Sequence, residues 1–244
     1  MDEYGSGPAQ DQMDAETGDA AAPTPSLPRR LFDAFVSPAK MGSAVAANPK
    51  WLGTMLVCAG LLALSVALLP YELFEEMQRR MTIQSGRPVQ EMPENARNII
   101  RIVSIAGAGI GFVIFSFIGA AVTTFVFAFV LGDEGKYRQY LAVGVHAAVI
   151  PTVAALLLIP MRIAAGDPQL TINLSTFLVF LPNGFVSNVF RALDVSRIWS
   201  SLVAAQGIHA IDRRRSFGSA AAIQLGILLV IALIAGWILT RQGL

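Results

Sequence analysis

Long apolar runs, separated by short charged segments, dominate the pattern of side chains along this chain. Residues 102–131 and 218–240 contain no ionisable side chain, and residues 51–69 contain none except Cys58. A helix needs about 20 apolar residues to cross the hydrocarbon core of a bilayer. The pattern therefore predicts an all-α fold, a polytopic membrane helix bundle.

Two further apolar segments bring the prediction to five transmembrane helices. The predicted spans are about 51–69, 102–131, 141–160, 193–211 and 218–240. The 30 residues of the second span would measure about 45 Å as a helix, so we expect it to tilt or project from a ~30 Å core. Pro151 removes one backbone hydrogen bond from the third span and is expected to kink it. His146, in the same span, is expected to be a helix-packing group.

The residues before the first span differ from the rest in composition. Residues 1–28 carry six acidic and no basic side chains and are rich in Ala and Pro, which predicts a disordered acidic tail. Residues 29–50 are predicted to form an interfacial lead-in helix that ends near Pro38. Its apolar face would consist of Leu31, Phe32, Phe35 and Val36. Arg29 and Arg30 are expected to face lipid headgroups.

Two patterns mark helix faces that we expect to contact protein. Gly107 and Gly111 form a GxxxG pair, the spacing at which helix backbones approach closely in membranes. In the fourth span, the polar stripe of Asp194, Arg197, Ser201 and His209 falls within an arc of about 120° on a helix. A polar group in the hydrocarbon core of a membrane costs free energy unless it faces protein or water. Asp194 and Arg197 are three residues apart and are expected to pair.

Two hypotheses account for the polar stripe. In the first, the Asp194–Arg197 pair orients the helix at the interface, and Ser201, Gln206 and His209 make interhelical hydrogen bonds. In the second, the stripe lines a substrate or proton path in which His209 titrates. We favour the first, because spans one, two and five contain no acid, base or histidine that could continue a path.

The sequence assigns no catalytic, cofactor-binding or metal-binding residue. Zinc sites need three or four ligands, whereas this chain has two histidines and one cysteine, all on different predicted spans. Motifs typical of serine hydrolases, zinc proteases and P-loop proteins are not found. With a net charge of +1, no bulk attraction to nucleic acid is expected. We therefore predict a non-enzymatic protein without a cofactor, whose surroundings are the lipid bilayer.

The basic residues near the span ends predict the orientation. Nine Lys and Arg side chains lie on the N-terminal side and seven on the other. The two shortest loops, which hold Lys136 with Arg138 and residues 213–215, are both basic and lie on the N-terminal side. Because basic loops stay in the cytoplasm, the N-terminus is predicted to be cytoplasmic. Residues 213–215 are expected to reach the headgroups there.

Three stretches of sequence carry a resemblance to a known family. They contain Phe35, Pro38 and Pro49 before the first span, then Tyr137, Arg138 and Gln139 in a tight loop, then Leu193, Asp194, Trp199 and Gly207 in the fourth span. In this order, over residues 31–236, they resemble the Yip-one family of Ypt-interacting membrane proteins, in its bacterial branch. The resemblance implies a five-span protein of the bacterial cytoplasmic membrane.

The chain departs from the family pattern in two places. Ser196 stands where an aromatic residue is common. Eukaryotic members carry an Asp-Leu-Tyr-Gly-Pro type motif before span one, and residues 3–8, EYGSGP, match it poorly. A Rab-type GTPase is therefore not expected as a partner.

Two functions remain as hypotheses. The first is a membrane scaffold that acts through helix packing with itself or with another membrane protein, for which Gly107 and Gly111 are the contact residues. The second is a small permease or channel-like transporter, with Arg197, Ser201 and His209 along its path.

Overall fold

The computed structural model describes residues 24–86 and 94–241, and this part of the chain is helical, with one isolated bridge between Asn173 and Asp194. The first half contains α1 (Leu27–Val36), α2 (Pro38–Ala47), α3 (Leu52–Ala67), α4 (Tyr71–Gln84) and α5 (Glu94–Thr124), which continues as a π-helix, η1 (Phe125–Val130). The second half contains α6 (Tyr137–Ala147), α7 (Val149–Leu157), α8 (Ile159–Ala165), the 3₁₀ turn η2 (Leu174–Phe177), α9 (Phe185–Ala192), α10 (Val195–Ile211) and α11 (Phe217–Arg241). The predicted fold class, an all-α helix bundle, is confirmed.

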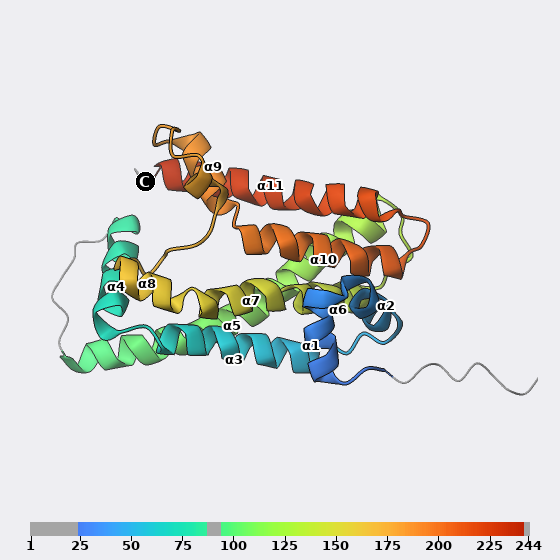
Figure 1. Ribbon diagram of the computed structural model, residues 1–244, viewed down its shortest axis with the longest axis horizontal. Coiled ribbons are helices and arrows are strands. Elements are labelled where there is room, and N and C mark those ends of the chain that lie inside the picture. The colour runs from blue at the N-terminus through green and yellow to red at the C-terminus, as the bar shows by residue number, and fades with distance from the viewer. Residues whose placement is uncertain (1–23, 87–93, 242–244) are drawn as a thin grey trace, which may run out of the picture.

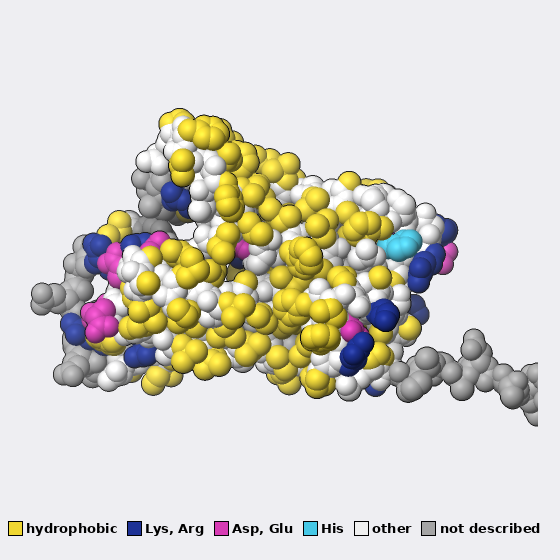
Figure 2. Space-filling model, in the orientation of Figure 1, with side chains coloured by type: hydrophobic (Ala, Val, Ile, Leu, Met, Phe, Trp, Pro, Cys, Tyr) yellow, Lys and Arg dark blue, Asp and Glu magenta, His cyan; other side chains and the backbone are white. Residues whose placement is uncertain are grey.

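The long helices lie roughly side by side, and the short ones gather at the two ends of the molecule. Figure 1 shows α10 and α11 above α3 and α7, with α5 crossing obliquely behind them. Helices α1 and α2 lie at the end where α10 turns into α11, and α4, α8 and α9 lie at the opposite end. Figure 2 shows hydrophobic side chains over the middle of this face and charged side chains mainly toward the two ends. This distribution fits a protein embedded in a bilayer.

Three helices in the described part of the chain are long and apolar enough to cross a membrane: Ala96–Val130, Tyr137–Ala165 and Phe217–Arg241. A fourth span results if the bent pair Leu52–Ala67 and Tyr71–Arg80 counts as one. The helices α3 and α10 have 16 and 17 residues, about 24 and 26 Å, and fall short of a ~30 Å core. The predicted count of five is therefore not confirmed and stays a prediction.

The third predicted span is broken into α6, α7 and α8, and the predicted effect of Pro151 explains one of the breaks. Proline has no N–H to donate to the carbonyl of Ala147, four residues earlier. That carbonyl instead accepts a hydrogen bond of 2.9 Å from the hydroxyl of Ser200 on α10. Close by, His146 is fully buried, with Nε2 2.8 Å from the hydroxyl of Thr54 and Nδ1 2.7 Å from the carbonyl of Ala142. These contacts fit the packing role expected of His146.

The segment before α3 differs from the single lead-in helix predicted for residues 29–50. It forms two helices, α1 and α2, because Pro38 begins a new helix immediately after Ser37. The apolar face of α1 is exposed at Phe32 and Val36, as expected for an interfacial helix. Arg30 was expected at the headgroups, but its side chain is buried and donates to the carbonyl of Lys50 at 2.9 Å. The predicted acidic tail lies largely outside the described residues, and α1 already begins at Leu27.

Helix α2 packs directly on the bundle, a contact that the pattern of side chains did not predict. A Cβ at Gly42 would lie 2.9 Å from the Cα of Gly207 on α10, so the two backbones touch. A Cβ at Gly207 would lie 2.5 Å from a methyl group of Val143 on α6. Around this crossing lie fully buried core side chains of α2, including Met41 and Val45. Close approach of this kind requires residues without side chains.

Substitution of Gly42 tests this contact. We expect Gly42→Ala to lower the free energy of unfolding by about 1–3 kcal/mol, because the added methyl group pushes α2 away from α10. Gly60→Ala is the matched control: it also lies inside a helix, but its Cβ would meet nothing within 4 Å. It should be neutral or slightly stabilising. Thermal unfolding in one detergent measures both, and equal effects would contradict the proposed contact.

Candidate functional site at the two ends of α10

The charged residues of the predicted fourth span lie toward the ends of α10. Asp194 is the N-cap residue: its Oδ1 accepts from the backbone N–H groups of Ser196 at 2.8 Å and Arg197 at 3.3 Å, and from the Ser196 hydroxyl. Asp212 follows the last residue of the helix at the other end. Neither carboxylate therefore lies in the middle of the apolar segment.

The predicted ion pair between Asp194 and Arg197 is wrong. The ion pairs within 4.0 Å among the described residues do not include it, and Arg197 is exposed. The reason is that the first N–H groups of a helix lack backbone acceptors, and a carboxylate three residues before Arg197 is placed to satisfy them. A spacing of three residues fits an N-cap as well as it fits an ion pair.

The predicted polar stripe is divided between two environments. Asp194, Arg197 and Ser201 line a cavity of about 430 Å³, where the Ser201 hydroxyl donates to the carbonyl of Arg197 at 3.0 Å. His209 lies two turns further on, with Nδ1 2.6 Å from the carbonyl of Arg215. A carbonyl only accepts, so Nδ1 of His209 carries the proton. Between Ser201 and His209 the helix buries residues such as Ala205 against the core.

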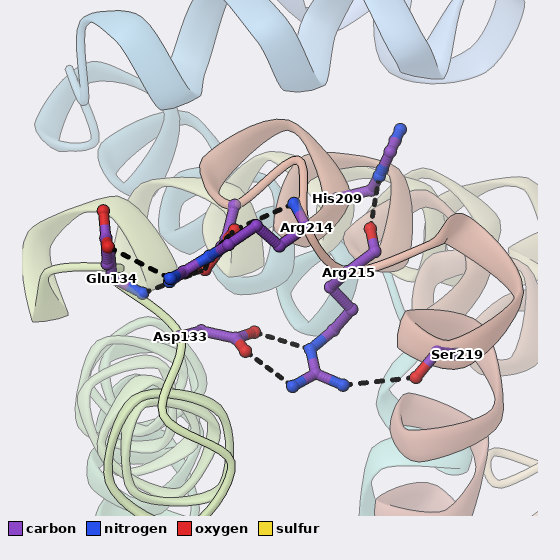
Figure 3. Close-up of polar contacts among 7 residues, drawn as sticks. Asp133, Glu134, His209, Arg214, Arg215 and Ser219 are labelled. Carbon is purple, nitrogen blue, oxygen red and sulfur yellow. Dashed lines mark hydrogen bonds and ion pairs between the residues drawn. The ribbon is translucent and has the colours of Figure 1, made fainter.

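The second environment is a charged network that joins two loops (Figure 3). Arg215 donates to both carboxylate oxygens of Asp133, from Nε at 2.6 Å and from Nη2 at 2.5 Å. Arg214 contacts Asp212 at 2.7 Å and Glu134 at 3.2 Å. Asp133 and Glu134 precede α6, whereas the arginines connect α10 to α11, so the network fastens these two loops together.

The network is partly buried, which changes how its groups titrate. Asp133 and Asp212 are 8% and 6% exposed. Hydrogen bonds from the Arg214 side chain hold the pKa of Asp212 well below its ordinary range. The hydrogen bonds with Asp133 raise the pKa of Arg215, whose guanidinium also lies 5.5 Å from the centre of the Phe127 ring. Asp212 is therefore charged at neutral pH.

This network corrects the expectation that residues 213–215 all reach headgroups. Arg213 is exposed, but the Arg215 side chain is 15% exposed and points into the protein. Sequence reasoning missed the acidic partners because they lie about 80 positions away. The available signal was a pair of adjacent acids, Asp133 and Glu134, in the other short loop of the same membrane side.

The Tyr-Arg-Gln loop has a structural role next to the network. The Oε1 of Gln139 accepts from the backbone N–H of Lys136 at 2.9 Å. Its Nε2 donates to the carbonyl of Ala46 at 2.9 Å, near the end of α2, where the helix carbonyls lack partners. Gln139 therefore connects the start of α6 to the end of α2.

The structure places the predicted GxxxG pair away from this site. A Cβ at Gly107 or Gly111 would meet nothing within 4 Å, so neither glycine mediates packing within the chain. The contact to α3 is made between them, where a Cβ at Gly109 would lie 3.2 Å from the carbonyl of Ala59. Contact of Gly107 and Gly111 with a second chain stays a prediction. In the part of the chain that the structure describes, no group of three His, Cys, Asp or Glu residues could hold a metal ion.

The N-cap role of Asp194 leads to a stability prediction. Asp194→Ala should cost about 0.5–2 kcal/mol, and Asp194→Asn should cost less because Asn also caps helices. Arg197→Gln should change the free energy of unfolding by less than about 0.5 kcal/mol, both in the wild type and in the Asp194→Ala variant. Thermal unfolding of the single and double variants decides the matter, and strong coupling between the two positions would restore the ion-pair interpretation.

The lowered pKa of Asp212 predicts a pH dependence. In the unfolded chain Asp212 takes up a proton near its ordinary pKa of about 3.9, while in the folded protein it stays charged to lower pH. The contribution of Asp212 to the free energy of unfolding is complete above its ordinary pKa. This contribution is lost as the pH falls toward the lowered pKa of the folded protein. Asp212→Asn should therefore be less stable at neutral pH and lose stability less steeply between about pH 6 and about pH 3. Glu134→Gln, at an exposed position, is the control, and an unchanged slope in Asp212→Asn would contradict the prediction.

Comparison with known proteins places the chain in a family. A search of curated proteins and a search of solved structures gave no match. A family model, the Yip1 domain, matches residues 32–239, which cover α2 to α10 in full, half of α1 and most of α11. This agrees with the resemblance found in the sequence, and the chain belongs to the Yip1 domain family of integral membrane proteins.

Proposed function

We propose that this protein is a non-enzymatic membrane scaffold that associates with a second copy of itself through α5. The observation that carries the proposal is the open face at Gly107 and Gly111, where no atom of the described chain would meet an added Cβ within 4 Å. In the most apolar part of this helix only 11% of the residues are buried inside the protein. Most of its surface is therefore available to lipid or to another helix.

The side chains around the two glycines form a suitable contact face. Val103, Ile110 and Ile114 lie within about one turn of the glycines and are 63%, 60% and 52% exposed. Two glycines four residues apart, flanked by β-branched residues, allow a partner helix to approach closely. A second copy presents the same face, which is self-complementary in a two-fold dimer.

The transport alternative finds partial support. The cavity beside α10 reaches Arg197 and Ser201, two of the three residues assigned to a path. His209, the third, is hydrogen-bonded in the charged network, and buried core residues such as Ala205 separate it from the cavity. Because a path must connect both sides of the membrane, we retain the scaffold as the proposed function.

We also propose that the N-terminus is cytoplasmic, in a bacterial cytoplasmic membrane. The proposal is supported by the basic loops, since Lys136, Arg138 and Arg213 lie at the same end of the molecule as α1 and α2. Arg214 and Arg215 are paired with acids, but acidic residues count little toward orientation.

Disulfide crosslinking in native membranes tests the scaffold proposal. In a Cys58→Ala background, which removes the single cysteine, Ile110→Cys should form a covalent dimer on mild oxidation. Adding Gly107→Leu or Gly111→Leu should strongly reduce the dimer, because the larger side chain separates the two helices. Val230→Cys, 56% exposed on α11, is the matched control in the same lipid and should remain monomeric.

Two outcomes would contradict the proposal. Equal crosslinking at Ile110→Cys and Val230→Cys would indicate random collision. Crosslinking of Ile110→Cys that is unaffected by both leucine substitutions would show that the glycines are not the contact. A covalent product with another protein would replace the second copy as the partner.

A further inference from the structure

The cavity beside α10 lies between two parts of the bundle. Its walls come from α3, α5 and α7 on one side and from α10 and α11 on the other. Pro151 and Leu158, at the two ends of α7, both line it, so the broken course of α6, α7 and α8 shapes the space. In Figure 2 the surface is hollowed between the α9 end of α11 and the region of α4 and α8. The cavity is therefore at the end of the molecule opposite the charged network.

The lining of the cavity has two chemical characters. The lining includes the side chains of Arg162 and Arg197 and of Thr171, Ser196 and Ser201. It also includes apolar side chains from three different long helices, namely Leu62, Phe112 and Leu228. A volume of about 430 Å³ lies within the range of small-molecule sites, roughly 300–1,000 Å³.

The lining of the cavity carries two positive charges and one negative charge. Among the described residues, neither Arg162 nor Arg197 forms an ion pair, and Arg162 donates only from Nε to the carbonyl of Leu170 at 3.1 Å. Asp167, the acid closest to Arg162 in sequence, is paired with Arg80 at 2.8 Å. Asp194 lines the cavity, but its Oδ1 already accepts the hydrogen bonds that cap α10. Two cations therefore face one carboxylate, which leaves the lining with a net charge of +1.

Guanidinium groups recognise phosphate through paired N–H donors, and hydroxyl groups complete such sites. A ligand that supplies the opposite charge and binds only the folded protein stabilises it. A free anion would make no contact with the apolar side chains of the lining, whereas a hydrocarbon chain could pack against them. The basic and the apolar side chains of the lining together fit a molecule with an anionic head and an apolar tail.

We propose that this cavity binds an anionic phospholipid, with the phosphate between Arg162 and Arg197 and the acyl chain along Leu62, Phe112 and Leu228. The inference goes beyond the scaffold role and does not depend on it, because the cavity and the Gly107–Gly111 face are different surfaces. A free phosphate shares the head chemistry but cannot use the apolar wall.

Native mass spectrometry and thermal shift of the full chain in mild detergent test the proposal. The probes are a phosphatidylglycerol, a phosphatidylcholine with the same acyl chains, and glycerol phosphate. We expect the anionic lipid to stay bound and to raise the melting temperature, and the other two probes to bind at least about tenfold more weakly. The variant with both Arg162→Gln and Arg197→Gln should bind the anionic lipid at least about tenfold more weakly than the wild type.

The control is Arg213→Gln, which removes the same charge from an exposed position at the other end of the molecule and should bind like the wild type. Arg197→Gln alone remains a test if the double variant does not fold, since no described residue accepts from that guanidinium. Equal binding by the double variant or equal binding of phosphatidylcholine would overturn the proposal. Binding of glycerol phosphate as tight as that of the lipid would overturn the assignment of the acyl chain.

Discussion

The backbone contact between Gly42 of α2 and Gly207 of α10 is the constraint on which the end of the protein formed by α1, α2 and the start of α6 depends. Within a bilayer, lipid tails compete equally for apolar side chains, so helices associate through close packing and hydrogen bonds. The crossing at Gly42 supplies such packing, and Val143 of α6 closes it from the other side of Gly207. Once α2 is fixed, the carbonyl of Ala46 lies within reach of Gln139, and the start of α6 is held as well.

A second requirement, that polar groups in a membrane find partners, explains the residues that first make α10 look unsuitable as a membrane helix. Asp194 caps the helix, and the Ser200 hydroxyl donates to the Ala147 carbonyl, which Pro151 leaves without a backbone donor. Asp212 and His209 belong to the contacts that close the turn into α11. Most of the polar residues therefore have a local partner, and Arg197, facing the cavity, is the exception among the charged ones.

Sequence periodicity predicted what depends on local composition and missed what depends on distant pairing. The apolar runs identified the long helices α5 and α11, and the rule for proline identified the kink at Pro151. The pattern could not show that α2 would bury Gly42, because residues 38–47 are too mixed to distinguish a surface helix from a packed one. Nor could it pair Arg215 with Asp133, since nothing in either loop specifies which distant loop it will meet.

The two open features of the molecule, the cavity and the exposed face of α5, meet on a single helical turn. Phe112 lines the apolar wall of the cavity, while Gly111, its neighbour in the chain, lies on the face proposed for self-association. The proposed lipid and the proposed second copy would therefore contact adjacent residues of α5, and coupling of the two binding events is a hypothesis. Because a ligand shifts an equilibrium only through different affinities for the two states, such coupling requires the dimer to favour one position of Phe112. The charged network, at the far end of the bundle, fastens the loop after η1 to the turn between α10 and α11.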